Sequence, residues 1–218
     1  MEIAKNKLNI IVGKNGTGKS TLLKIITKNI KADCKITSDF SHYFYLPQNP
    51  YYPKDITLFD YLSLVFFKNN WKWFLNQDEK NKVNEVLELV NLFDKKNLYI
   101  EKLSGGEIQK ANIAIGLLSQ SDLFLLDEPA SNMDLINQIK IIELLKDLTN
   151  KSITSVVIMH DINLVSNYGD LFFGLGYNNS IISKNRDEFF TGENLKKIYG
   201  IDFEILKNNG RLYVQISD

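Results

Sequence analysis

The chain has 218 residues, with 26 basic and 26 acidic side chains and a formal net charge of zero, so it is long enough for one large domain or for a core with a subdomain. The balanced charge and the scarcity of arginine, which occurs only at Arg186 and Arg211, disfavour a nucleic-acid partner. The single cysteine, Cys34, excludes an internal disulfide, and we find neither a signal peptide nor a membrane span of roughly 20 apolar residues, so we expect a cytosolic chain.

The first predicted element is a strand over residues 8–12, followed by a glycine-rich loop and an amphipathic helix that ends around Asn29. The loop fits G-x-x-x-x-G-K-[ST], a pattern whose backbone N–H groups point at phosphate oxygens at the start of a helix. Lys19 would reach the β- and γ-phosphates, and the Ser20 hydroxyl would bind Mg²⁺. The strand before and the helix after disfavour the alternative, a glycine-rich loop without a ligand. The residues that fit the pattern are Gly13, Lys14, Asn15, Gly16, Thr17, Gly18, Lys19 and Ser20.

A second strand is predicted over residues 42–46, where Pro47 ends it. Gln48 lies just beyond this strand. Ligands of an open parallel sheet bind at the carboxyl ends of the strands, so we expect Gln48 at the nucleotide.

Residues 55–121 change to helical periodicity, which predicts an inserted helical subdomain. An unusual group of aromatic residues lies within it. Packing inside the subdomain is the favoured interpretation, and a patch that faces a partner is the alternative. These residues are Phe66, Phe67, Trp71, Trp73 and Phe74.

The next motif reads LSGGE over residues 103–107 and begins a helix. Ser104 is a good N-cap and Glu107 completes a capping box, which accounts for both residues. It does not account for Gly105 and Gly106. At a helix start, these glycines expose N–H groups that would suit a second phosphate site.

After the predicted helical subdomain, two predicted strands rich in apolar residues are each followed by polar side chains. The run over residues 123–126 is typical of a buried parallel strand, and it ends at Asp127 and Glu128. Asp127 would hold Mg²⁺ through water and Glu128 would polarise an attacking water, although a turn or helix cap before Pro129 is the alternative. The strand over residues 153–159 ends at His160, which again lies at a carboxyl end.

The remaining elements complete an alternating α/β pattern. Helices are predicted over residues 135–148 and 194–199, and strands over residues 171–174 and 181–184. Asn209 and Gly210 predict a terminal hairpin.

Taken in this order, the motifs resemble those of the ATP-binding cassette (ABC) ATPases over almost the whole chain. The LSGGE run is the discriminating feature, because the phosphate loop and the apolar strand ending in Asp127 occur in many NTPase families and this run does not. The resemblance implies an α/β fold in which residues 1–218 form one ABC ATPase domain. A P-loop NTPase core with a mainly parallel, RecA-like sheet would comprise residues 1–54 and 122–218. Residues 55–121 would be the inserted α-helical subdomain, and the N-terminal antiparallel β-layer would be reduced.

The resemblance also implies roles for individual residues, with ATP and Mg²⁺ as cofactors. Glu128, His160 and Gln48 would be catalytic, and Ser20, Gln48 and Asp127 would bind the metal. Residues 13–21, which extend the loop to Thr21, would be the Walker A motif, and residues 131–134 the D-loop. Nucleotide contacts of the signature and the D-loop would come from Ser104, Gly105, Gly106, Glu107 and Asp134.

Members of this family work as head-to-tail dimers, in which the Walker A side of one subunit and the signature of the other enclose each ATP. Gly105 and Gly106 would then complete a γ-phosphate cage in the second subunit. The implied partners are transmembrane permease subunits, which would hold this cytoplasmic chain at the inner face of the cell membrane.

The C-terminal stretch over residues 189–202 is similar to the ends of importer ATPases for iron-siderophores, haem and cobalamin. We therefore expect the motor subunit of an importer of a metal chelate or similar solute. A soluble non-transport ABC ATPase and a degenerate cassette that only binds nucleotide are the alternatives.

The sequence departs from the family in two places. Most members have an N-terminal β-layer whose aromatic side chain stacks on adenine, whereas only residues 1–7 precede the first strand here and none is aromatic. Either the reading frame starts upstream, or base recognition is weak, with Tyr43 or Tyr45 as substitutes for the missing aromatic. In addition, Lys110 stands where the family usually has arginine, which keeps the charge but loses the planar fork.

Overall fold

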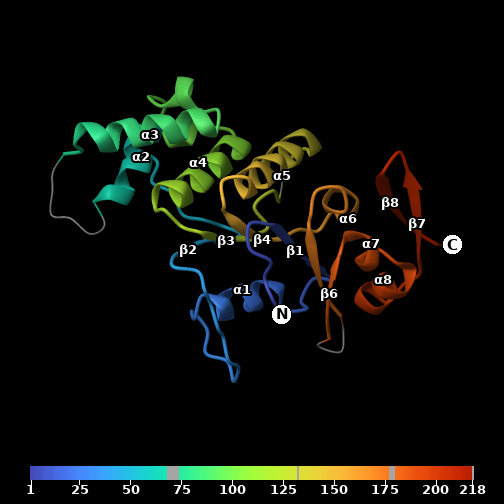
Figure 1. Ribbon diagram of the computed structural model, residues 1–218. Helices are drawn as coiled ribbons and strands as arrows, with labels where there is room; N and C mark the ends of the chain where they lie inside the picture. The colour runs from blue at the N-terminus through green and yellow to red at the C-terminus, as the bar shows by residue number, and fades with distance from the viewer. Residues whose placement is uncertain (68–73, 132, 177–179, 218) are drawn as a thin grey trace.

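The fold is organised around a six-stranded sheet in the order β2-β3-β4-β1-β5-β6, which runs through the middle of the molecule in Figure 1. The computed structural model describes residues 1–67, 74–131, 133–176 and 180–217. The strands of the sheet are β1 Leu8–Gly13, β2 Tyr43–Leu46, β3 Leu123–Asp127, β4 Thr154–Ile158, β5 Leu171–Leu175 and β6 Ile181–Asn185. Neighbouring strands are parallel except for β5 and β6. The predicted α/β class with a mainly parallel sheet is therefore confirmed.

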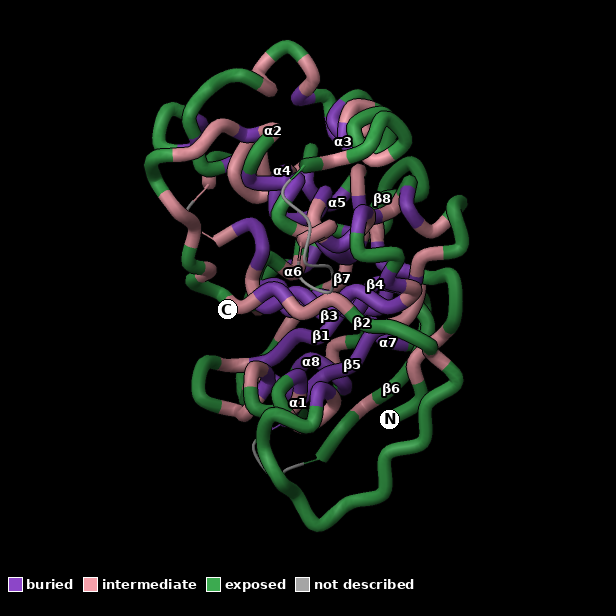
Figure 2. Tube along the Cα trace, turned by 90° about the vertical axis from the view of Figure 1, so that its left-hand side faces the viewer, coloured by how far each residue is buried: buried purple, intermediate pink, exposed green. Residues whose placement is uncertain are grey.

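The central strands are buried because helices cover both faces of the sheet. Their side chains alternate between two apolar layers: on β1, Ile10 and Val12 belong to one layer and Ile11 to the other. Figure 2 shows β3 and β4 as largely buried and the edge strand β6 as exposed. The first layer packs against α5 Leu135–Thr149, α6 Ile162–Val165, α7 Arg186–Phe189 and α8 Gly192–Tyr199, and the second against α1 Lys19–Ile26.

Helix α1 is shorter than predicted. It ends at Ile26 rather than around Asn29, because Lys28 adopts a left-handed conformation with φ of 59° and its N–H bonds to the carbonyl of Ile25 at 2.9 Å. Residues 1–7 and 27–42 are all described and contain no strand. This agrees with an N-terminal β-layer that is reduced. Besides α1, Ile3 and Phe40 from these segments pack against this face of the sheet.

The helical subdomain has an apolar core of its own. This core joins α2 Leu58–Ser63, α3 Gln77–Leu89 and α4 Gly105–Leu118. Of the predicted aromatic group, Phe66 packs against this core, Phe74 is 85% exposed, and Trp71 and Trp73 lie outside the described residues. The exact boundaries of the subdomain, residues 55 and 121, stay a prediction.

The predicted hairpin is confirmed as β7 Phe203–Asn208 and β8 Arg211–Ile216, with positive φ at both Asn209 and Gly210. Two amide side chains attach this hairpin to the core. Asn163 exchanges hydrogen bonds with the backbone of Val214, and Asn167 does so with Leu212.

Candidate active site

The phosphate loop connects β1 to α1 with the backbone geometry that its glycines allow. Gly16 has a φ of 80° and Gly18 a φ of 87°, both in the left-handed region. Gly18 is the N-cap of α1, and no side chain of the described residues caps this helix start or places an acid in its first turn. The first N–H groups of α1 therefore remain available to an anion.

Lys19 lies beneath this loop and is only 5% exposed. Its ammonium donates to the carbonyl oxygens of Gly13 at 2.8 Å and Lys14 at 2.7 Å. Burial lowers the pKa of Lys19, and the nearby charges of Glu128 and Asp127 oppose this shift. An anion bound on the loop would relieve the cost of this partly desolvated charge.

Asp127 ends strand β3 next to the start of α1. It is 3% exposed and accepts a hydrogen bond of 3.0 Å from the Ser20 hydroxyl. Burial raises the pKa of Asp127; the Ser20 hydrogen bond opposes the rise and the charge of Glu128 adds to it. A carboxylate that is costly to ionise beside a hydroxyl suits a hard divalent cation such as Mg²⁺.

The protein supplies only part of such a metal site. No group of three or more His, Cys, Asp or Glu side chains in the described ranges could hold a metal by itself. Mg²⁺ usually takes one or two protein ligands and completes its octahedron with phosphates and water, so Ser20 and Asp127 are the residues that could hold it here.

Glu128 is held by residues that follow the two neighbouring strands. Gln48, after β2, donates to Oε2 at 2.7 Å, and Nε2 of His160, after β4, lies 2.5 Å from Oε1. Strand order β2-β3-β4 brings these three side chains together. Glu128 itself has a φ of 52°, a conformation that costs a non-glycine residue about 1–2 kcal/mol.

These groups line one cavity of about 400 Å³. Its lining combines uncapped N–H groups, one ammonium and one fixed carboxylate, which can bind a polyphosphate and orient a water beside it. The residues that line it are Asn15, Gly16, Gly18, Lys19, Ser20, Thr21, Gln48, Glu128 and His160.

The predicted nucleotide contacts of the signature and the D-loop lie elsewhere, at the starts of α4 and α5. Ser104 and Glu107 form the expected capping box, and Glu107 also pairs with Lys95. Partial burial alone would raise the pKa of Glu107, but hydrogen bonds from Lys95 and Ser104 outweigh it and hold this pKa below its ordinary value. Nothing in the sequence pointed to Lys95, because its ion pair with Glu107 forms only once the chain before α4 folds back onto the start of that helix.

Asp134 caps α5 and accepts hydrogen bonds from the backbone and side chain of Asn137. A Cβ on Gly106 would lie 3.2 Å from the side chain of Asn137, so the two helix starts adjoin. A Cβ on Gly105 would meet nothing within 4 Å. None of these residues lines the 400 Å³ cavity, and Asn132 lies outside the described residues. The chain therefore presents two separate groups of predicted site residues.

Over the described part of the chain, no helix combines the length and the apolar character that a bilayer span requires.

The family model for ABC transporters matches residues 1–131. An uncharacterised ABC transporter ATP-binding protein of Methanocaldococcus jannaschii is 35% identical over 215 residues, which cover 92% of this chain and 84% of that protein. The petrobactin import ATP-binding protein YclP of Bacillus subtilis is 30% identical over 230 residues, which cover 99% of this chain and 91% of that protein.

The fold is also shared with solved structures. The chain of an inward-facing ABC transporter assigned to the metal-chelate type has a TM-score of 0.87 at 24% identity. The match covers 100% of this chain and 88% of that one.

Proposed function

The chain belongs to the ABC transporter family as an ATP-binding subunit, and from this we propose that it hydrolyses ATP with Mg²⁺ to drive the import of a metal chelate or similar solute. The observation that carries the hydrolytic part is the position of Glu128. Its carboxylate is fixed by Gln48 and His160 in the same cavity as Lys19 and Ser20. A nucleotide-binding site without hydrolysis would have no need of a carboxylate held in this way.

Binding of the triphosphate is assigned to the loop and to the start of α1. The N–H groups at Gly16 and Gly18 and the ammonium of Lys19 would hold the phosphate oxygens. Ser20, Asp127 and Gln48 would hold Mg²⁺, in part through water, and the bound ion would neutralise charge that develops on the phosphates.

Hydrolysis is assigned to Glu128, which would orient the attacking water. His160 and Gln48 keep the carboxylate at the carboxyl end of β3, so the water is positioned before the reaction starts. The proximity of these residues argues against a degenerate cassette that only binds nucleotide.

A head-to-tail homodimer would complete the site. Ser104, Gly105, Gly106, Glu107 and Asp134 do not line the cavity of their own chain. Beside Asp134, Leu135 is 58% and Ile136 65% exposed, an apolar surface that a second copy would cover. In this arrangement the signature residues of one subunit would contact the nucleotide of the other.

The import of a metal chelate rests on the relatives. One of them is an import protein for petrobactin, and the C-terminal stretch resembles other importers of this kind. We propose that permease subunits hold the chain at the cytoplasmic face of the membrane. Recovery of a permease with the affinity-tagged chain from membranes of its own cells would support this, and recovery of ribosomes or DNA-repair proteins alone would favour the soluble alternative.

The test of the hydrolytic function is the ATPase activity of the purified chain with Mg²⁺. We expect Glu128→Gln to retain ATP binding and to lose hydrolysis, because only the group that orients the water is changed. Glu85→Gln, an exposed glutamate of α3, is the matched control and should behave as wild type. Turnover in Glu128→Gln equal to that of wild type would remove Glu128 from this role.

A further inference from the structure

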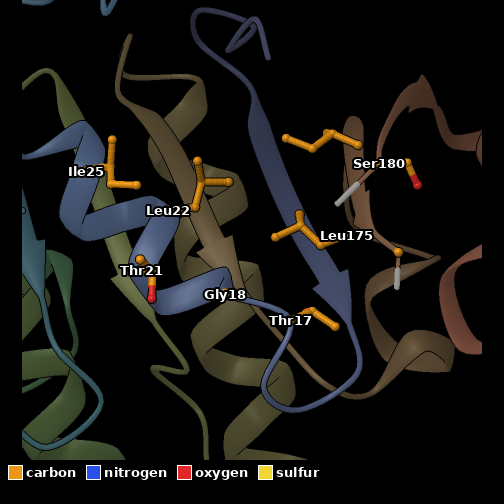
Figure 3. Close-up of a pocket in the computed structure, with 9 residues that line it drawn as sticks. Thr17, Gly18, Thr21, Leu22, Ile25, Leu175 and Ser180 are labelled. Carbon is orange, nitrogen blue, oxygen red and sulfur yellow. The ribbon is translucent and has the colours of Figure 1, made fainter. Parts of the chain in front are cut away.

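A second cavity lies beside the phosphate loop, between α1 and the strands β5 and β6. Its volume is about 250 Å³. Figure 3 shows side chains of α1 on one side and those of the β5–β6 edge on the other. Its walls are Thr21, Leu22 and Ile25 from α1 and Leu175, Ser180 and Ile181 from the sheet edge. We call this cavity the edge pocket.

The edge pocket suits a flat, weakly polar group. Four aliphatic side chains form most of its walls, three hydroxyl side chains (Thr17, Thr21 and Ser180) lie among them, and none of the described residues that line it is charged. Its volume is slightly below the range of roughly 300–1,000 Å³ that holds drug-sized ligands. A single heterocycle would fit, whereas a whole nucleotide or a charged group would not.

The edge pocket adjoins the phosphate cavity. Gly18 and Thr21 line both of them. A ligand whose phosphates sit on the loop would therefore bring whatever is attached to them to the mouth of the edge pocket. In a nucleoside triphosphate, the group joined to the phosphates through the ribose is a flat heterocycle.

Neither of the two tyrosines that the sequence suggested, Tyr43 and Tyr45, provides an aromatic ring on which the base could stack at the edge pocket. The Tyr43 hydroxyl donates to the carbonyl of Thr27 at 3.0 Å, and the Tyr45 hydroxyl is buried. Neither residue lines the edge pocket, and residues 1–7 contain no aromatic side chain. Apolar walls are thus the surface that the described chain offers to the base.

We infer that the edge pocket is the base subsite of the nucleotide, an inference that rests on the proposed ATP-binding site. The base inserts between Ile25 of α1 and Ile181 of β6 instead of stacking on an N-terminal aromatic ring. Aliphatic walls contact adenine and guanine alike, so the subsite contributes affinity with little selectivity between purines.

The test compares ligands with and without a base. Binding of ATP, GTP and inorganic tripolyphosphate is measured by titration calorimetry in a Glu128→Gln background. The pocket variant is Ile25→Gln/Ile181→Gln, whose two positions are both partly exposed. Ile201→Gln is the control, because Ile201 is 41% exposed against 45% for Ile181 and does not line the pocket.

We expect the pocket variant to lose about tenfold in affinity for both ATP and GTP and to bind tripolyphosphate as before. The control should bind all three ligands unchanged. A pocket variant that binds ATP as tightly as its parent would overturn the inference. An equal loss for tripolyphosphate would also overturn it, because the effect would then lie in the phosphate site.

Two further outcomes are separable. If the parent protein bound neither ATP nor tripolyphosphate, the proposed function itself would be contradicted. Where the double variant does not fold, Ile181→Ala shortens one exposed side chain. It should cost about threefold in affinity for ATP and GTP and leave tripolyphosphate binding unchanged. No change in that variant would count against the inference.

Discussion

Nε2 of His160 lies 2.5 Å from Oε1 of Glu128, and the two residues follow the carboxyl ends of the adjacent strands β4 and β3. Gln48 binds the other carboxylate oxygen at 2.7 Å. Both oxygens are thus fixed without a nucleotide, which in the proposed role of Glu128 would lower the cost of orienting a water at that position. The strand order alone makes this arrangement possible.

Lys19 should be needed for binding rather than for hydrolysis alone. We expect Lys19→Ala to abolish measurable ATP binding, because it removes the buried ammonium that lies beneath the loop. Lys31→Ala, an exposed lysine after α1, should bind ATP as wild type. Calorimetric titration measures both, and tight binding in Lys19→Ala would contradict the assignment.

Nucleotide should control the association of two copies. We expect the chain to be monomeric without nucleotide and dimeric with ATP and Mg²⁺, most clearly in Glu128→Gln, because each ATP would bridge two subunits. Adding Ile136→Glu should prevent the dimer by placing a charge on the exposed surface beside Asp134. Sedimentation velocity measures this, and a monomer at saturating ATP would argue against the head-to-tail arrangement.

The ion pair of Glu107 with Lys95 should make stability depend on pH. The pKa of Glu107 lies below its unfolded value, so this carboxylate contributes stability above the unfolded pKa and loses it as the pH falls through the folded pKa. Glu107→Gln should lower the free energy of unfolding by about 1 kcal/mol near neutral pH.

The difference between Glu107→Gln and wild type should vanish in acid, where both side chains are neutral. Urea unfolding of the two proteins, from neutral pH down to a pH below the folded pKa of Glu107, measures this difference in the free energy of unfolding. A difference that persists unchanged in acid would show that the loss comes from the shape of the side chain and not from its charge.

The left-handed backbone conformation of Glu128 should lower the free energy of unfolding of the protein. Because its φ is 52°, Glu128→Gly should unfold with a free energy about 1 kcal/mol higher than Glu128→Ala, since neither variant keeps the side-chain contacts and only alanine bears the strain. At Ser131, which is described outside any helix or strand, the same pair of variants is the control. Equal stabilities of the two Glu128 variants would show that the strain is relieved elsewhere.

Much of the fold could be predicted because the signals are local. The glycine pattern around Lys19, the capping box of Ser104 and Glu107, and the turn at Asn209 and Gly210 each depend on a few consecutive residues. Continuous apolar runs indicated the buried strands, because a strand covered on both faces has no polar side. The carboxyl-edge rule then placed Gln48, Asp127 and His160 at the same edge of the sheet.

The sequence by itself determined where the phosphate loop, the buried strands and the capped helices lie, and it predicted which residues would bind phosphate, hold Mg²⁺ and orient water, because these depend on residue type and short spacing. Only the tertiary structure decided how they combine. Strand order brought Gln48 and His160 to the two oxygens of Glu128, and helix packing left Gly106 beside Asn137, outside the cavity. The edge pocket between Ile25 and Ile181 had no signal, because its walls are apolar residues far apart in the chain that resemble core positions until they are packed.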